Sequence, residues 1–91
     1  MLYRLKKDIR PTENIAFFDS DKNDFVDGFY VENGVIGELI DQGKSCNKRH
    51  LTFWFDREKS IEFFGWKHFQ EYLEPIDFET AEALMSEDTR H

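Results

Sequence analysis

Two short bursts of aromatic residues constrain this chain more than any other feature of its sequence. The bursts are Leu51-Thr-Phe-Trp-Phe55 and Phe63-Phe-Gly-Trp-Lys-His-Phe69, in a chain that holds ten Phe, three Tyr and two Trp. Each aromatic side chain buries roughly 150–250 Å² when it packs inside a protein. The chain can therefore build a real hydrophobic core. It also has more aromatic surface than one small core easily hides, which points to a pocket or a partner interface.

The length of the chain bounds the number of domains. A chain of 91 residues lies within the usual size of one domain, about 50–200 residues. We expect a single α+β domain over residues 1–85 and a frayed C-terminal tail over residues 86–91. A domain this small buries only about 60–65% of its unfolded surface, so marginal stability is expected and dimerisation is a common remedy.

The cysteine count and the hydropathy pattern indicate a cellular compartment. Cys46 is the only cysteine, so there is no internal disulfide framework and the reducing cytoplasm is the natural location. Residues 1–8 contain no apolar run long enough for a signal peptide, and no stretch approaches the ~20 apolar residues of a membrane span. We expect a cytoplasmic protein without membrane contact.

Charge is distributed in blocks along the chain. The net charge is −7, with the acidic residues concentrated in residues 13–41 and 71–91 and the basic residues in 1–12 and 42–70. Binding to duplex nucleic acid is unlikely, because it needs Lys and Arg to displace counterions from phosphates. The acidity is compatible with a basic protein partner or with mimicry of nucleic acid, but solvated surface that keeps the protein soluble is the favoured interpretation, because local charge runs are usually exposed faces.

Several segments have the composition of β-strands. Leu2–Leu5 alternates weakly, and the apolar run Ile15–Phe18 is bounded by polar residues. In the run 51–55, Leu51, Phe53 and Phe55 face one way and Trp54 the other. Residues 60–64 are a candidate hairpin partner for this run, across the polar turn 56–59. Residues 41–49 have the composition of an exposed loop.

Residues 27–40 carry the clearest local turn signal. Asn33-Gly34 lies between two β-rich runs, and this dipeptide accepts the two positive φ values of a type I′ turn. The sequence therefore predicts a hairpin across Asn33 and Gly34, with Tyr30 on the face opposite Phe29 and Val31. Gly37 lies inside the returning strand, where glycine marks a bulge or a close backbone approach.

The hydrophobic spacing changes beyond Gly65. Trp66, Phe69 and Leu73 share one face of a helix that Pro75 stops. Asp77 is placed to cap a last helix, whose apolar face would be formed by Phe78, Ala81, Leu84 and Met85. The predicted fold is α+β, with a small antiparallel and strongly bent sheet, or a partly closed barrel, of four to five strands and one or two C-terminal helices.

Three motifs resemble chemical sites without completing them. Asp19, Asp21, Asn23 and Asp27 fall at ligand positions of a calcium loop, but Asp24 replaces its turning glycine and the bidentate glutamate is missing. Gly43-Lys-Ser45 resembles the end of a P-loop, but the glycine required five residues earlier is absent. Cys46 has basic neighbours that can lower a thiol pKa, but no general base or oxyanion site is assignable to it. We expect no catalytic residue, no metal site and no cofactor.

The aromatic residues outside the predicted core give the most usable functional hypothesis. We expect Tyr30, Trp54 and Phe64 to project from the sheet face opposite the core, where a helix, a second subunit or a ligand would cover them. The candidate partner- or ligand-binding residues are Tyr30, Trp54, Phe64, Trp66 and His68.

Those residues favour a non-enzymatic interaction module that forms a homodimer through its aromatic face and binds a protein partner. The alternative is a binder of an apolar or aromatic small molecule in an aromatic-lined cleft. An enzyme or a nucleic-acid mimic is a less favoured reading. Trp54 together with Arg49 and Arg57 could also stack on single-stranded nucleic acid, although the overall acidity of the chain argues against it.

Overall fold

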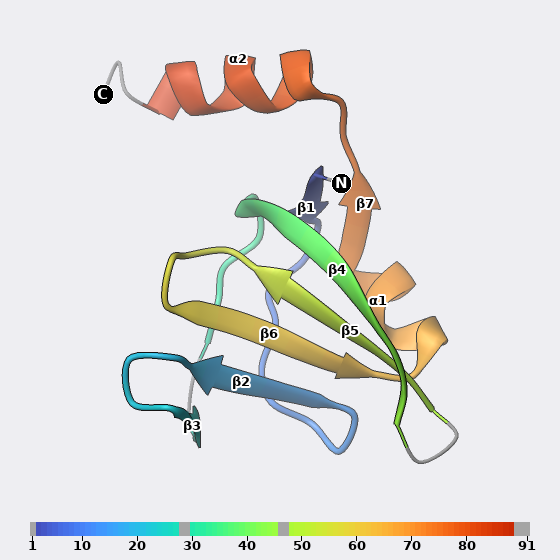
Figure 1. Ribbon diagram of the computed structural model, residues 1–91. Coiled ribbons are helices and arrows are strands. Elements are labelled where there is room, and N and C mark those ends of the chain that lie inside the picture. The colour runs from blue at the N-terminus through green and yellow to red at the C-terminus, as the bar shows by residue number, and fades with distance from the viewer. Residues whose placement is uncertain (1, 28–29, 46–47, 89–91) are drawn as a thin grey trace.

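The computed structural model describes the backbone of residues 2–27, 30–45 and 48–88, and all of their side chains except those of Ser45, Trp66 and residues 84–88. Seven strands and two helices follow one another along the chain (Figure 1). They are β1 (Leu2–Leu5), β2 (Ile15–Asp19), β3 (Asp24–Val26), β4 (Ile36–Ser45), β5 (Lys48–Trp54), β6 (Lys59–Phe64), α1 (Trp66–Tyr72), β7 (Leu73–Pro75) and α2 (Phe78–Asp88).

All seven strands belong to one open antiparallel sheet. Its strand order is β3-β2-β6-β5-β4-β1-β7, so the expectation of four to five strands with partial barrel closure is wrong. Two of the additional strands, β3 and β7, are three residues long and come from segments whose sequences predict a loop and the end of a helix. They form the two edges of the sheet and do not pair with each other. Short edges, one of which carries Pro75, protect a sheet against unwanted pairing.

The centre of the sheet is the predicted hairpin of β5 and β6. Leu51 pairs with Phe63 and Phe53 pairs with Ile61, so their side chains lie on the same face. All four are at most 2% exposed. Strand β2 continues this face on the other side of β6 with Ile15 and Phe17. The period-2 alternation of apolar residues therefore selects the buried face in all three strands.

The predicted hairpin across Asn33 and Gly34 does not form. Val31 exchanges backbone hydrogen bonds with Ile9, and β4 pairs with β1 and β5 instead. Gly34 has a φ of +93°, whereas Asn33 does not have a positive φ. A single positive φ at the second central residue suits a type II turn, not the type I′ turn of a two-residue hairpin. Pairing of β4 with β5 runs from Glu38 to Ser45, a longer ladder than a short local hairpin would give.

Residues 41–49 are not the predicted loop. β4 continues through Ser45 and β5 begins at Lys48, so the two strands extend as a long polar arm. The pairing register shifts between Asp41 and Lys44, where Gly43 adopts a φ of +86°, the local geometry of a glycine bulge. Polar composition predicts solvent exposure correctly, but it does not exclude strand structure in an arm that leaves the core. Cys46 lies outside the described residues.

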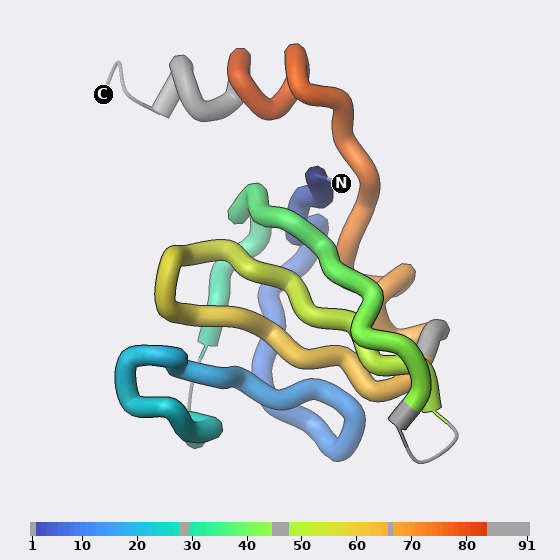
Figure 2. Tube along the Cα trace, in the orientation of Figure 1, coloured from blue at the N-terminus to red at the C-terminus, as the bar shows by residue number. Residues whose placement is uncertain are grey.

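One face of the sheet is covered by α1 and by connecting segments. The rings of Tyr3 and Phe69 meet edge-on with centroids 6.1 Å apart, and those of Phe63 and Tyr72 lie 6.4 Å apart. Ile9 and Val31 belong to the same buried cluster. The trace in Figure 2 shows the segments that carry these two residues passing behind β6 and β5. The hydrophobic core therefore lies on the side of the sheet that faces α1.

The two helices begin and end close to their predicted positions. α1 ends at Tyr72, before Pro75, because Leu73 is already extended and pairs with Leu5 of β1. α2 begins after Asp77, whose Oδ1 accepts a hydrogen bond from the Thr80 backbone N–H at 2.6 Å, as expected of an N-cap. The helix includes residues 86–88 of the expected tail. No helix in the described part of the chain is long and apolar enough to cross a membrane.

Candidate functional site

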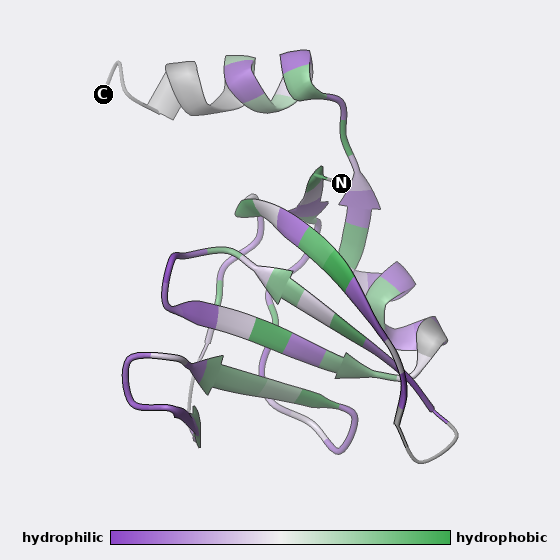
Figure 3. Ribbon diagram, in the orientation of Figure 1, coloured by the Kyte–Doolittle hydropathy of each residue, from purple (hydrophilic) through white to green (hydrophobic). Residues whose placement is uncertain are grey.

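We call the face of the sheet opposite α1 the open face, because neither helix crosses it in the described part of the chain. Figure 1 shows α2 beyond the end of the sheet, on the side of the N-terminus. Figure 3 shows apolar and polar positions mixed along the strands. Because alternate residues of a strand point to opposite faces, the side chains opposite the core in the central hairpin are those of His50, Thr52, Trp54, Ser60, Glu62 and Phe64.

Strand register arranges these six side chains in three rows. His50 lies opposite Phe64, Thr52 opposite Glu62, and Trp54 opposite Ser60. The aromatic residues therefore occupy the outer rows, and Glu62 lies in the middle row between them.

The neighbouring strands extend the same pattern. Ala16 of β2 lies opposite Glu62, and Phe18 lies opposite Ser60. The ring of Phe25 on β3 packs edge-on against Phe18, with centroids 5.5 Å apart, and Phe25 is 56% exposed. Small side chains, Ala16 and Thr52, thus lie on either side of Glu62 across the sheet, while Phe64 is its neighbour on the same face along β6.

The centre of the open face holds a connected group of polar side chains. The imidazole of His50 stacks on the Phe64 ring at 4.7 Å, and His50 Nε2 lies 3.5 Å from Glu62 Oε1. Thr52 accepts a hydrogen bond from Gln42 Nε2 at 3.2 Å. Burial raises the pKa of the Glu62 carboxyl above its ordinary value, while a hydrogen bond from Thr52 and the charge of His50 act in the opposite direction. The open face therefore contains a carboxylate that is costly to ionise.

Three buried polar atoms at this centre have no hydrogen-bond partner among the residues that the structure describes. They are His50 Nε2, Ser60 Oγ and Glu62 Oε2. The His50–Glu62 separation of 3.5 Å is too long for a good hydrogen bond, and Ser60 is only 1% exposed. Buried polar atoms in native proteins almost always have partners, so each such atom needs an explanation. These three residues occupy adjoining rows of one face. We therefore look for one cause of all three unpartnered atoms.

The structure does not bring the predicted binding residues together. Trp54 and Phe64 lie on the open face as expected, two rows apart on either side of Glu62. His68 belongs to α1, on the core side of the sheet, and is half-buried. The side chain of Trp66 lies outside the described residues. The prediction that these residues bind a partner or ligand stays a prediction.

Tyr30 lies away from the open face, because the hairpin that would have placed it there is absent. Its hydroxyl donates to Asp8 Oδ2 at 2.8 Å, and the guanidinium carbon of Arg10 lies 5.3 Å from its ring centroid. The Asn33 backbone N–H also donates to Asp8, and this bond and the Tyr30 hydroxyl are the main causes that lower the Asp8 pKa. Tyr30 therefore ties two connecting segments together.

Sequence reasoning missed Glu62, His50 and Ser60. The signal that could have found them is the alternation that placed Trp54 and Phe64 opposite the core, because residues two and four positions away share that face. What the sequence does not supply is the register that sets Glu62 opposite Thr52 and next to His50.

The acidic segment 19–27 forms a tight connection between β2 and β3. Asp19 Oδ1 accepts a hydrogen bond from the Asp21 backbone N–H at 3.0 Å, and Asn23 has a φ of 54°. In the described ranges, no group of three or more His, Cys, Asp or Glu side chains is placed to hold a metal ion.

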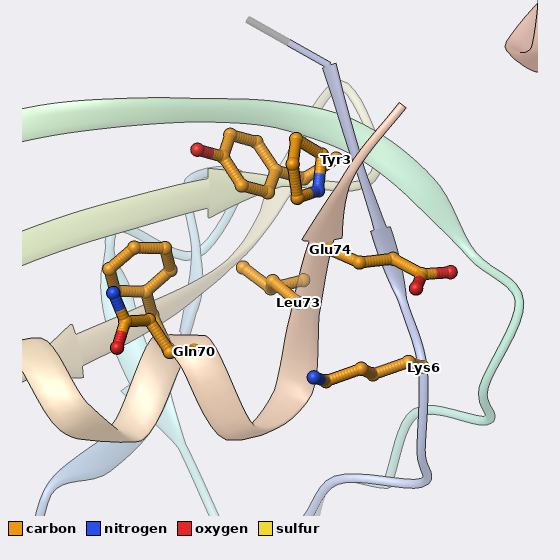
Figure 4. A pocket seen from close by; sticks show the side chains of 7 residues that line it. Tyr3, Lys6, Gln70, Leu73 and Glu74 are labelled. Atoms are coloured by element: carbon orange, nitrogen blue, oxygen red, sulfur yellow. The ribbon is translucent and has the colours of Figure 1, made fainter. Parts of the chain in front are cut away.

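A separate hollow of about 420 Å³ lies between α1, β1 and β7 (Figure 4). Phe69 and Leu73 are almost fully buried, and with half-buried Tyr3 they give the hollow an apolar lining. Its polar lining includes Lys6 and Gln70. The remaining lining residues are Glu74 and Pro75.

Comparison of this chain with protein-family models, curated proteins and solved structures finds no match. Function is therefore inferred from the residues and their geometry.

Proposed function

We propose that the protein is a non-enzymatic interaction module that self-associates through its open face. The single observation that carries this proposal is the apolar surface that this face leaves exposed: Phe25, which packs on Phe18, is 56% exposed, and Ile40, which lies opposite Thr52, is 40% exposed. An exposed apolar patch of this kind suits a two-fold interface, in which each copy presents the same patch to the other.

The aromatic residues around Ser60 and Glu62 fit the centre of such an interface. Trp54 and Phe18 flank Ser60, and Phe64 lies on the other side of Glu62. Interface centres are enriched in aromatic side chains and depleted in charge. These aromatic side chains would supply most of the binding energy.

Analytical ultracentrifugation at micromolar concentration tests the proposal. Dimers are expected, and Trp54→Ala should weaken the dimer by about 2 kcal/mol, or roughly 30-fold in dissociation constant. The effect should be nearly independent of salt, because screening acts on charge and the contact is mainly aromatic.

Tyr30→Ala is the matched control, because it removes an exposed aromatic side chain that lies away from the open face. It should leave the dissociation constant unchanged. A monomer at every accessible concentration would refute self-association. Equal weakening by both substitutions would show that the contact is not located at Trp54.

A further inference from the structure

The hollow between α1, β1 and β7 has the size and lining of a small-molecule site, and it is independent of the open face. Its volume of about 420 Å³ lies within the range of about 300–1,000 Å³ typical of ligand pockets. Phe69 is 5% exposed and Leu73 is 3% exposed, so the lining is held rigidly by the core. The Tyr3 ring meets Phe69 edge-on and supplies an apolar wall with a polar hydroxyl.

A single uncompensated positive charge lies at the rim of this hollow. The Lys6 backbone N–H donates to the Tyr72 carbonyl at 2.8 Å, which fixes its backbone beside α1. Lys6 lines the hollow, and Figure 4 shows its side chain extending toward the end of α1. Among the described residues, Lys6 has no ion-pair partner.

The other charges nearby are already engaged. Glu74 also lines the hollow, but Figure 4 shows its carboxylate pointing away from α1, and it accepts two hydrogen bonds from the Arg4 guanidinium. Lys7 places its ammonium 4.6 Å from the centroid of the Tyr72 ring. Lys6 therefore remains the cation that is available to a ligand in the hollow.

We infer that this hollow binds a small aromatic carboxylate. The ring of the ligand would lie against Tyr3 and Pro75, above the almost fully buried Phe69 and Leu73, where it exchanges water contact for apolar contact. Its carboxylate would pair with the Lys6 ammonium at the rim. An apolar body with one anionic end matches a lining that is apolar at the bottom and carries a cation at its edge.

Phenylacetate is a suitable probe, with phenylacetamide as the uncharged analogue and acetate as the anion without a ring. Each is titrated into the ¹⁵N-labelled protein while amide chemical shifts are recorded. Phenylacetate should shift the amide signals of Gln70, Leu73 and Glu74 saturably, with a dissociation constant on the order of 1 mM for a ligand of this size. Phenylacetamide should have a dissociation constant about three to five times higher, because it lacks the ion pair with Lys6 and one solvent-exposed ion pair contributes about that factor to affinity. Acetate should give no saturable shift.

Lys6→Met and Lys7→Met form a matched pair of variants. Lys6→Met keeps an apolar stem and removes the charge, so it should weaken phenylacetate about three- to fivefold and abolish the preference over phenylacetamide. Lys7→Met removes the neighbouring charge, which contacts Tyr72 instead, and should leave both affinities unchanged. Both positions are exposed, so both variants should fold, as their unperturbed amide spectra would show.

Three results would overturn this inference. They are the absence of saturation by phenylacetate up to about 20 mM, equal effects of the two variants, and shifts located on β2, β5 or β6 instead of α1 and β7. None of these results bears on self-association, which is measured by sedimentation without any ligand.

Discussion

Substitution of Gly37 by alanine should destabilise the sheet through a backbone clash. An added Cβ would lie 2.9 Å from the Trp54 carbonyl carbon, closer still to the carbonyl oxygen, and 3.0 Å from Phe53 Cε1. Real Cβ atoms essentially never approach other atoms this closely. Because the main obstacle is the backbone of β5, no rotamer change can relieve it, and β4 and β5 must move apart locally.

The size of this effect follows from two opposing contributions. Overpacking of a well-packed site costs about 1–3 kcal/mol, whereas replacing glycine by alanine inside a strand is otherwise favourable by roughly 0.5–1 kcal/mol. A net loss of about 1–2 kcal/mol is expected, which lowers the Tm of a domain this size by about 4–16 °C. Thermal unfolding followed by circular dichroism measures it.

Gly43→Ala provides the comparison for Gly37→Ala. At Gly43 an added Cβ meets no atom within 4 Å, but the φ of +86° is strained for alanine, so a loss of about 1 kcal/mol is expected from conformation alone. Only Gly37→Ala should also disturb the amide signals of Phe53 and Trp54. An unchanged or raised Tm for Gly37→Ala would refute the argument from close approach.

Two further substitutions test the electrostatics of the fold. Because the Glu62 pKa is raised above 4.5 by burial, the folded state holds this proton more tightly than the unfolded state, and stability falls as pH rises from the ordinary value through the folded value. Glu62→Gln should remove this pH-dependent loss of folding stability and so raise the free energy of unfolding at neutral pH. Urea unfolding at about pH 4 and about pH 7 measures it, and a variant that is less stable than the native protein at neutral pH would contradict the argument. Asp77→Ala removes the N-cap bond to Thr80 and should loosen the first turn of α2, seen as faster exchange of the first α2 amides while the sheet stays intact. Since the Asp77 pKa is lowered from 3.8, the native cap should weaken as pH falls below 3.8 through the folded value, and pH-independent exchange of those amides would count against it.

The parts of the fold that the sequence predicts are those specified by local pattern. The hairpin of β5 and β6 follows from alternation, and α2 follows from Asp77 as its cap. β3 and β7 are three residues long, too short to show a period, and they exist because β2 and β1 offer unpaired edges. The Asn33-Gly34 turn signal was outweighed by pairing between distant segments, namely β4 with β1 and β5. Such long-range choices have no signature in a local window.

The residues of the candidate site likewise fall into those that the local sequence pattern predicts and those that it does not. Alternation was sufficient to place Trp54 and Phe64 opposite the core, and it failed for Tyr30 because that residue's face was inferred from the hairpin that does not form. The polar centre depends on inter-strand register, which brings His50 to 3.5 Å from Glu62 although they are twelve positions apart in the chain. Register is fixed by the packing of the whole sheet.

The most direct measurement of self-association is an isotope-filtered NOE experiment on an equimolar mixture of labelled and unlabelled protein. Only contacts between copies give signals in this experiment. The proposed interface predicts intermolecular NOEs from the Trp54 indole and the Phe64 and Phe18 rings, the aromatic residues around Glu62. Intermolecular NOEs confined to the edge strands β3 and β7 or to α2 would contradict it, as would a complete absence of such NOEs at millimolar concentration.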